Sequence, residues 1–133
     1  MKQTTLYNSL FPRLRSLHLN LSSLAVDNCD YAVQVGEIIT CTRACRFQME
    51  EGPQHLWEEN VKTFLRNLKA IDIGDWEINY QGETEDFRWT LILEYDNHTA
   101  LTYVGIGDYP DRFLALLKLL KLEDWLLTLA PLP

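Results

Sequence analysis

The stretch of residues 87–122 constrains the fold most, because its pattern predicts two strands followed by a helix. Across residues 87–95 apolar side chains alternate with polar ones, which is the period of a strand with one buried face. Asp96 and Asn97 come next, and both residue types tolerate the left-handed backbone of a two-residue hairpin turn. The sequence therefore predicts an antiparallel hairpin whose return strand covers residues 98–105.

A leucine-rich helix is predicted to follow this hairpin over residues 109–122. Asp108 is placed to cap the helix, with Pro110 in its first turn and Asp111 near the positive end of the helix dipole. Most other side chains of this segment are apolar. We expect such a helix to lie in the core or to present a second apolar face to a partner.

The first two thirds of the chain predict a meander of strands and one further helix. Residues 21–26, 31–35 and 38–49 are rich in β-branched or alternating residues and are expected to form antiparallel strands. Residues 54–69 carry apolar side chains at helical spacing and are expected to form a helix. A short strand is expected over residues 76–80.

The sequence does not determine the path of residues 1–20 or of residues 123–133. Leucines recur at helical spacing in the first segment, but Pro12 interrupts them, so a short helix that begins near Pro12 and an extended arm are both compatible. The last segment contains Trp125 and several leucines. Full burial of each leucine is worth roughly 1.5–3 kcal/mol. The tail is therefore expected to pack back on the domain or to join a homodimer interface.

Length and pattern together define the predicted architecture. The chain has 133 residues and shows no repeat or linker, so residues 1–133 are expected to form a single domain. The fold class is predicted as α+β, with an antiparallel β-sheet and two main helices packed on one face. Those helices are the segments 54–69 and 109–122.

The acidic balance of the chain restricts its partners. The formal net charge is -7 and the pI is about 4.8. Such a surface repels phosphate backbones and anionic lipids, so direct binding of nucleic acid or membrane is not expected. No apolar run approaches the ~20 residues of a membrane span, and the N-terminus does not resemble a secretory signal. The charge suits a partner with a basic surface or a cationic ligand.

The three cysteines predict free thiols. Cys41 and Cys45 are four residues apart, which places them about 13 Å from each other along a strand, too far for a disulfide or one zinc ion. An odd cysteine count favours a reducing compartment, so a bacterial-type cytoplasm is expected. No metal or other cofactor is predicted.

The sequence contains no recognisable catalytic motif. His18, His55 and His98 fall in three different predicted elements, and no nucleophile signature accompanies them. Gly105-Ile106-Gly107 precedes a helix but lacks a third glycine, and Asp108 would repel a phosphate. We therefore expect a protein that is not an enzyme.

Aromatic and acidic side chains provide the candidate binding residues. Aromatic rings with one polar neighbour are expected to line a pocket between sheet and helices if one exists. Acidic loop residues and apolar residues of the C-terminal region are expected to contact a partner. The pocket candidates are Trp57, Trp76, Trp89, Tyr109 and His98, and the interface candidates are Trp125, Leu126, Leu119, Glu83, Glu85 and Asp86.

One resemblance covers residues 57–122. Small uncharacterised bacterial and phage-borne domains have a tryptophan strand and an alternating strand, followed by a glycine, a Tyr-Pro pair and a leucine-rich helix. This chain is similar to them at Trp76, Tyr80, Trp89, Gly105, Tyr109-Pro110, Phe113 and Leu116-Leu117. The resemblance implies a β-β-α unit and carries no established activity.

Three functional hypotheses follow from these features. The first is a non-enzymatic acidic interaction protein of the inhibitor or immunity type, which occludes a basic protein partner. The second is a small-ligand-binding or enzymatic domain whose pocket is walled by tryptophans. The third is a homodimeric structural domain that associates through the C-terminal helix and tail.

Overall fold

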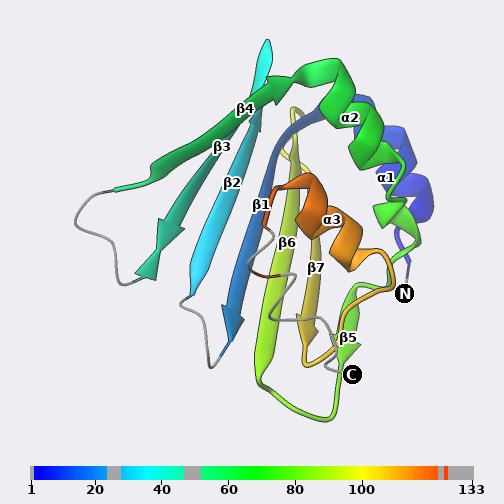
Figure 1. The fold of residues 1–133 in the computed structure, drawn as a ribbon. Coiled ribbons are helices and arrows are strands. Elements are labelled where there is room, and N and C mark those ends of the chain that lie inside the picture. Colours follow the sequence, from blue (N-terminus) through cyan, green and yellow to red (C-terminus); the bar gives the residue numbers. More distant parts are fainter. Residues whose placement is uncertain (1, 24–27, 47–51, 123–124, 126–133) are drawn as a thin grey trace.

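A computed structural model describes residues 2–23, 28–46, 52–122 and 125. These residues form one seven-stranded sheet with strand order β4-β3-β2-β1-β6-β7-β5 and three α-helices (Figure 1). All neighbouring strands pair antiparallel except β5 and β7, which are parallel. The predicted class, α+β with a mostly antiparallel sheet, is confirmed. The elements are α1 (Thr4–Leu10), β1 (Leu14–Ser23), β2 (Cys29–Val35), β3 (Ile38–Cys45), β4 (Gln54–Asn60), α2 (Val61–Lys69), β5 (Asn79–Gln81), β6 (Phe87–Tyr95), β7 (Ala100–Ile106) and α3 (Phe113–Leu119), with 3-10 turns η1 (Phe11–Arg13) and η3 (Ile73–Asp75).

Strand β1 is the centre of the sheet, and the sequence did not predict it at this position. It covers residues 14–23, whereas a strand was expected only from residue 21. Leu17, Leu19 and Leu21 alternate along it and are each 0% exposed. The residues before β1 form α1 and the turn that contains Pro12. Both open readings of this segment were therefore incomplete, because the chain forms a helix first and a strand afterwards.

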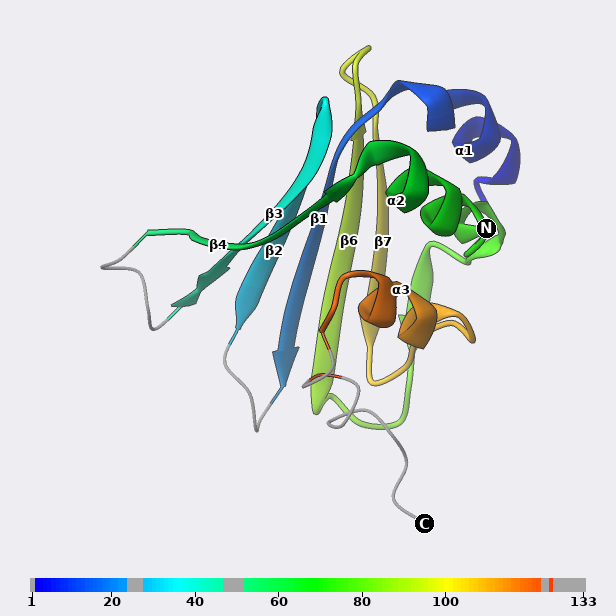
Figure 2. The same cartoon turned by 45° about the horizontal axis from the view of Figure 1, so that its top comes forward.

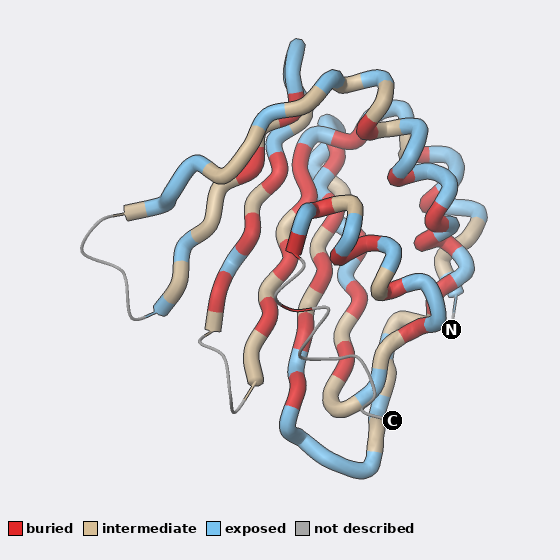
Figure 3. The backbone as a smooth tube through the Cα atoms, in the orientation of Figure 1, coloured by how far each residue is buried: buried red, intermediate tan, exposed pale blue. Residues whose placement is uncertain are grey.

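Strands β1, β6 and β7 bury about every second residue, as Figure 3 shows by the alternation of colours along the central strands. The hairpin of β6 and β7 was predicted correctly in its strands, but the reversal between them is longer than two residues. The Tyr95 N–H donates to the carbonyl oxygen of Thr99, and His98 takes the left-handed backbone conformation at φ 67°. Buried strand residues include Tyr31, Val33, Ile39, Cys41, Trp89, Leu91, Leu93, Leu101 and Tyr103.

Both predicted helices are shorter in the structure. Residues 54–60 form the edge strand β4, and α2 begins only at Val61, because the side chain of Asn60 caps it by accepting from the Thr63 N–H at 3.1 Å. The last helix begins at Phe113. The predicted Asp108 cap is therefore wrong, since that carboxylate accepts from the Tyr109 N–H instead.

The helices contact the sheet through aromatic rings. Phe64 of α2 lies 5.9 Å from Trp57 of β4, and Phe113 of α3 lies 4.7 Å from Trp89 of β6, measured between ring centroids. The Trp57 indole N–H donates to the carbonyl oxygen of Leu120 at 3.0 Å, which joins β4 to the end of α3. Figure 2 shows α2 and α3 as neighbours, in a view from another direction.

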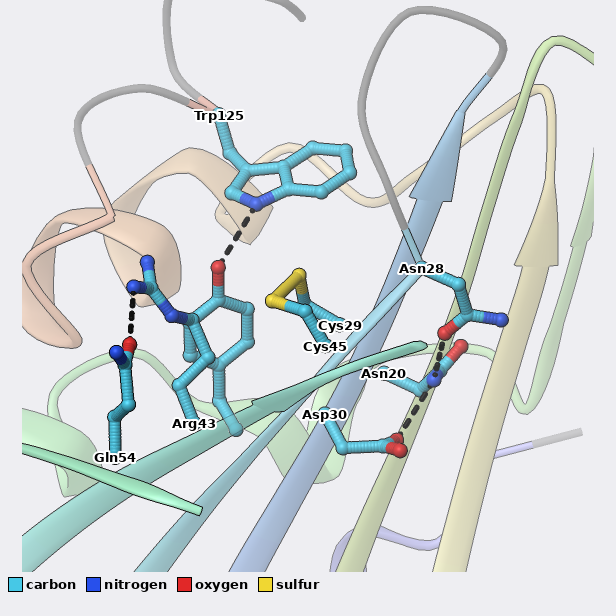
Figure 4. Close-up of a disulfide and its surroundings, with 9 residues drawn as sticks. Asn20, Asn28, Cys29, Asp30, Arg43, Cys45, Gln54 and Trp125 are labelled. Carbon is cyan, nitrogen blue, oxygen red and sulfur yellow. Dashed lines mark hydrogen bonds between the residues drawn. A yellow bond between two sulfur atoms is a disulfide. The ribbon is translucent and has the colours of Figure 1, made fainter. Parts of the chain in front are cut away.

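Two of the three cysteines form a disulfide, so the prediction of free thiols is wrong for them. Cys29 and Cys45 are directly opposite each other in the β2–β3 ladder and are joined by an S–S bond (Figure 4). The spacing argument considered only Cys41 and Cys45 and missed this cross-strand partner. Cys41 is a buried free thiol, and burial raises its pKa to about 11. Such a disulfide is rare in the reducing compartment that the odd cysteine count had favoured.

Trp125 packs against the same end of the sheet. It is 3% exposed, and its indole N–H donates to the Tyr31 hydroxyl at 3.1 Å (Figure 4). Its ring lies 6.0 Å from that of Phe87. None of the helices in the described part of the chain is long and apolar enough to span a membrane.

The disulfide predicts a specific thiol count. Protein isolated without reductant and unfolded in the presence of a maleimide should gain one adduct per chain, at Cys41. Prior reduction should raise this to three adducts, because Cys29 and Cys45 then become available. Mass spectrometry of the intact chain distinguishes the two counts. Three adducts in the unreduced sample would contradict the disulfide.

Candidate functional site

A hollow of about 420 Å³ lies where the turn after α2 meets the segment between β7 and α3. We call it the acidic hollow. Four carboxylates, three aromatic side chains and one guanidinium contribute to its wall. They are Asp72, Asp75, Asp108 and Asp111, with Trp76, Tyr80 and Tyr109, and Arg112; Pro110 completes the lining.

Two stretches of sequence bring the carboxylates together. The first is η3, which Asp72 enters with a left-handed backbone at φ 57° and which ends at Asp75. The second is the segment between β7 and α3, which holds Asp108 and Asp111. The Arg112 Nη1 donates to Asp72 Oδ2 at 3.1 Å and to the carbonyl oxygen of Ile71 at 3.3 Å. This side chain therefore ties the two stretches together.

A buried aromatic cluster supports the hollow from below. Trp76 is 4% exposed and contacts Trp89 and Tyr103 in edge-to-face geometry, with 6.2 Å between ring centroids in each case. Tyr109 packs on Phe113 at 5.4 Å. Such ring pairs add about 0.5–1.5 kcal/mol each beyond the area they bury. The aromatic part of the wall is therefore held by the core.

Gly105 allows the closest approach in this region. The Trp89 indole N–H donates to the carbonyl oxygen of Asp108 at 2.9 Å, directly over Gly105. A Cβ atom at Gly105 would lie 2.0 Å from Trp89 Nε1 and 2.7 Å from that carbonyl oxygen. A residue without a side chain is therefore required for the chain to turn from β7 into the hollow.

The charged side chains that line the hollow give it a net negative charge. Four aspartates and one arginine line it, and among the described residues Arg112 forms an ion pair with Asp72. The pKa of the Tyr80 hydroxyl is raised, chiefly by burial. The Glu77 N–H donates to this hydroxyl and acts in the opposite direction. The nearby carboxylates of Glu77, Asp108 and Asp111 raise the pKa further. The hollow can therefore accept a cation, and its tyrosine rings add cation–π attraction.

A second hollow, of about 430 Å³, lies on the other face of the sheet at the β6–β7 reversal. It includes His98 and an imidazole–carboxylate pair, in which His18 Nε2 lies 3.2 Å from Glu94 Oε1. The free thiol of Cys41 cannot join this pair, because its side chain points to the opposite face of the sheet. Within the described ranges, no three His, Cys, Asp or Glu side chains are close enough to hold a metal ion.

The five predicted pocket residues fall into three places. Trp76 and Tyr109 line the acidic hollow, and Trp89 lies beneath it, where it is 2% exposed. Trp57 packs on α2 and the end of α3. His98 belongs to the hollow on the other face. Sequence reasoning thus found part of the aromatic wall.

The predicted interface residues come from the loop before β6, from α3 and from the C-terminal segment. Glu83, Glu85 and Asp86 are exposed between β5 and β6, and Glu85 pairs with Arg88 at 3.3 Å. Leu119 is half-buried on α3. Trp125 is buried against the sheet and offers no surface to a partner, and Leu126 lies outside the described residues.

The four aspartates were missed as a site. Asp108 was assigned as the cap of the last helix and Asp111 to its first turn, and Asp72 and Asp75 were assigned no role. A partial signal was present, because Asp75 directly precedes Trp76 and Asp108 directly precedes Tyr109. Comparisons of the chain with protein-family models, with curated proteins and with solved structures gave no match. The resemblance to small bacterial and phage-borne domains therefore stays a prediction.

Proposed function

We propose that this protein is a non-enzymatic binding protein that captures a basic partner protein by taking an arginine or lysine side chain into the acidic hollow. The observation that carries the proposal is that four aspartates and three aromatic residues line one hollow of about 420 Å³. Arg112 neutralises one of these carboxylates, which leaves a net negative site for the partner's cation. Capture would occlude the basic surface around that side chain.

The long-range charge supports the same mechanism. A formal net charge of -7 attracts a basic surface and accelerates encounter, while the hollow supplies the short-range contact. In this proposal α2 and α3 together cover one face of the sheet and hold the hollow at the edge of that layer. A rigid wall favours affinity, because little side-chain freedom is lost on binding.

Neutralising two carboxylates tests the proposal. The probe is N-acetyl-arginine-N′-methylamide, titrated against the 15N-labelled chain by NMR. Asp108→Asn combined with Asp111→Asn should weaken binding about tenfold, since each exposed charge pair contributes roughly 0.2–1 kcal/mol and more where it is partly desolvated.

The matched control is Asp30→Asn combined with Glu37→Gln. These exposed residues of β2 and the following turn change the net charge equally but lie several strands away from the hollow. The control should bind the probe as the unmodified chain does, within a factor of two. Equal weakening by both pairs would show that net charge alone attracts the probe, which would contradict a built site.

A further inference from the structure

An apolar groove of about 470 Å³ lies next to the acidic hollow, between α2 and α3. We call it the interhelical groove. Its walls carry Ala70 from the end of α2 and Ala115 from α3, and Ile71 and Leu119 add apolar surface. The two alanines leave the space open, because neither side chain extends beyond Cβ.

Arg112 lines both the interhelical groove and the acidic hollow. Its contacts with Asp72 and with the carbonyl oxygen of Ile71 hold it at the boundary between them. A bound segment of a few residues therefore meets the hollow on one side of this guanidinium and the groove on the other. The two depressions form one continuous surface.

The charges change sign along this surface. The hollow is acidic, whereas Lys118 and Lys121 stand beside the groove. Lys121 Nζ lies 4.9 Å from the ring centroid of Trp57, which fixes its position at the rim. A second cation on the ligand would be repelled here, and a carboxylate would be attracted.

Glu59 of β4 also lines the groove. Its Oε2 atom is enclosed and has no hydrogen-bond partner among the described residues, so a docked segment does not reach this atom. The groove thus offers apolar contact and a basic rim.

From this continuity and charge complementarity we infer the chemistry of the partner segment, an inference that rests on the proposed function. The segment carries arginine or lysine at one end for the acidic hollow. A leucine, isoleucine, methionine or phenylalanine in its middle enters the interhelical groove. An aspartate or glutamate at the other end meets Lys118 and Lys121.

Selection from a random 12-residue peptide library displayed on phage tests the inference with the full chain as bait. Enriched peptides should combine a basic, an apolar and an acidic position in a fixed order. Ala115→Phe, which fills the groove, should remove the apolar preference and keep the basic one, whereas the volume-neutral control Ala115→Ser should keep both. Asp108→Asn with Asp111→Asn should remove the basic preference and keep the apolar one.

Each outcome of the selection has a distinct meaning. Peptides enriched only in basic residues would overturn the inference about the groove and leave the proposed function standing. Peptides with an apolar preference and no basic position would overturn the proposed function. No enrichment would overturn both.

Synthetic peptides from the selection provide the affinity test. Replacement of the apolar residue by glycine should weaken binding to the unmodified chain about tenfold, because one aliphatic side chain loses its burial. The same replacement should change binding to the Ala115→Phe variant less than twofold. Equal losses for both proteins would place the apolar contact outside the groove.

Discussion

Gly105→Ala should lower the free energy of unfolding by about 4 kcal/mol. The new Cβ would overlap the Trp89 indole nitrogen, and the indole N–H would lose its bond to the Asp108 carbonyl oxygen. Overpacking of a core costs about 1–3 kcal/mol, and a buried donor left without its acceptor costs a further 1–3 kcal/mol. Urea denaturation followed by tryptophan fluorescence measures the loss.

Two further variants make this result specific. Gly36→Ala should change stability by less than about 0.5 kcal/mol, since its Cβ would lie 3.6 Å from its nearest neighbour, the carbonyl oxygen of Ile38, in ordinary contact. In a Trp89→Phe background, the cost of Gly105→Ala should shrink, because the overlapping atom is gone. A Gly105→Ala cost as small as that of Gly36→Ala would mean that the Trp89–Asp108 contact does not constrain the chain.

Phe113→Ala should lower the free energy of unfolding by about 3–5 kcal/mol. Phe113 is 0% exposed, and its ring centroid lies within 4.7–6.2 Å of the rings of Trp76, Phe87, Trp89 and Tyr109. The substitution removes the ring that packs against both Trp76 and Tyr109, which line the acidic hollow. Binding of the arginine probe should therefore weaken in any population that remains folded.

Leu114→Ala is the matched control on the same helix. Leu114 is half-buried, so its truncation should cost about 1 kcal/mol, and alanine keeps the helix propensity high. If the Phe113→Ala variant does not fold, Phe113→Leu should still fold with a loss of about 1.5 kcal/mol or less. Equal costs for Phe113→Ala and Leu114→Ala would contradict the packing of α3 on β6.

The parts of the fold with an unambiguous period could be predicted from the sequence. The alternation across residues 87–95, which Ile92 alone interrupts, and the apolar return strand identify β6 and β7. Strand β1 was missed because its leucines satisfy two periods at once. Leu10, Leu14, Leu17 and Leu21 have helical spacing, whereas Leu17, Leu19 and Leu21 alternate. This segment forms a strand, and not a helix, because it pairs with β2 on one side and with β6 on the other.

The start of α2 shows how a single cap outweighs a periodic stripe. Trp57 and Val61 fit a helical face with Phe64, which extended the predicted helix to residue 54. Asn60 was overlooked as a cap, and the residues before it pair with β3 as an edge strand. Pairing across a sheet is a long-range contact, and local sequence carries no record of it.

The acidic hollow could not be predicted from the sequence either, because it also depends on contacts between segments that are distant in the sequence. Its aspartates come from two segments more than thirty residues apart in sequence, joined by the Arg112–Asp72 contact. Trp76 and Tyr109 were predicted as pocket residues from their type, but Asp108 and Asp111 were assigned to the start of the last helix, and Asp72 and Asp75 to no site. The disulfide was missed likewise, because the register that places Cys29 opposite Cys45 is a property of the sheet.

The most direct test of the account maps where a single guanidinium binds. The 15N-labelled chain is titrated by NMR with N-acetyl-arginine-N′-methylamide and, in parallel, with the uncharged citrulline analogue of the same shape. The arginine compound should shift the signals of Trp76, Tyr80, Tyr109 and Asp111, and the citrulline compound should leave them in place. Shifts spread over the acidic surface without these residues, or equal shifts from both compounds, would contradict a cation site in the acidic hollow.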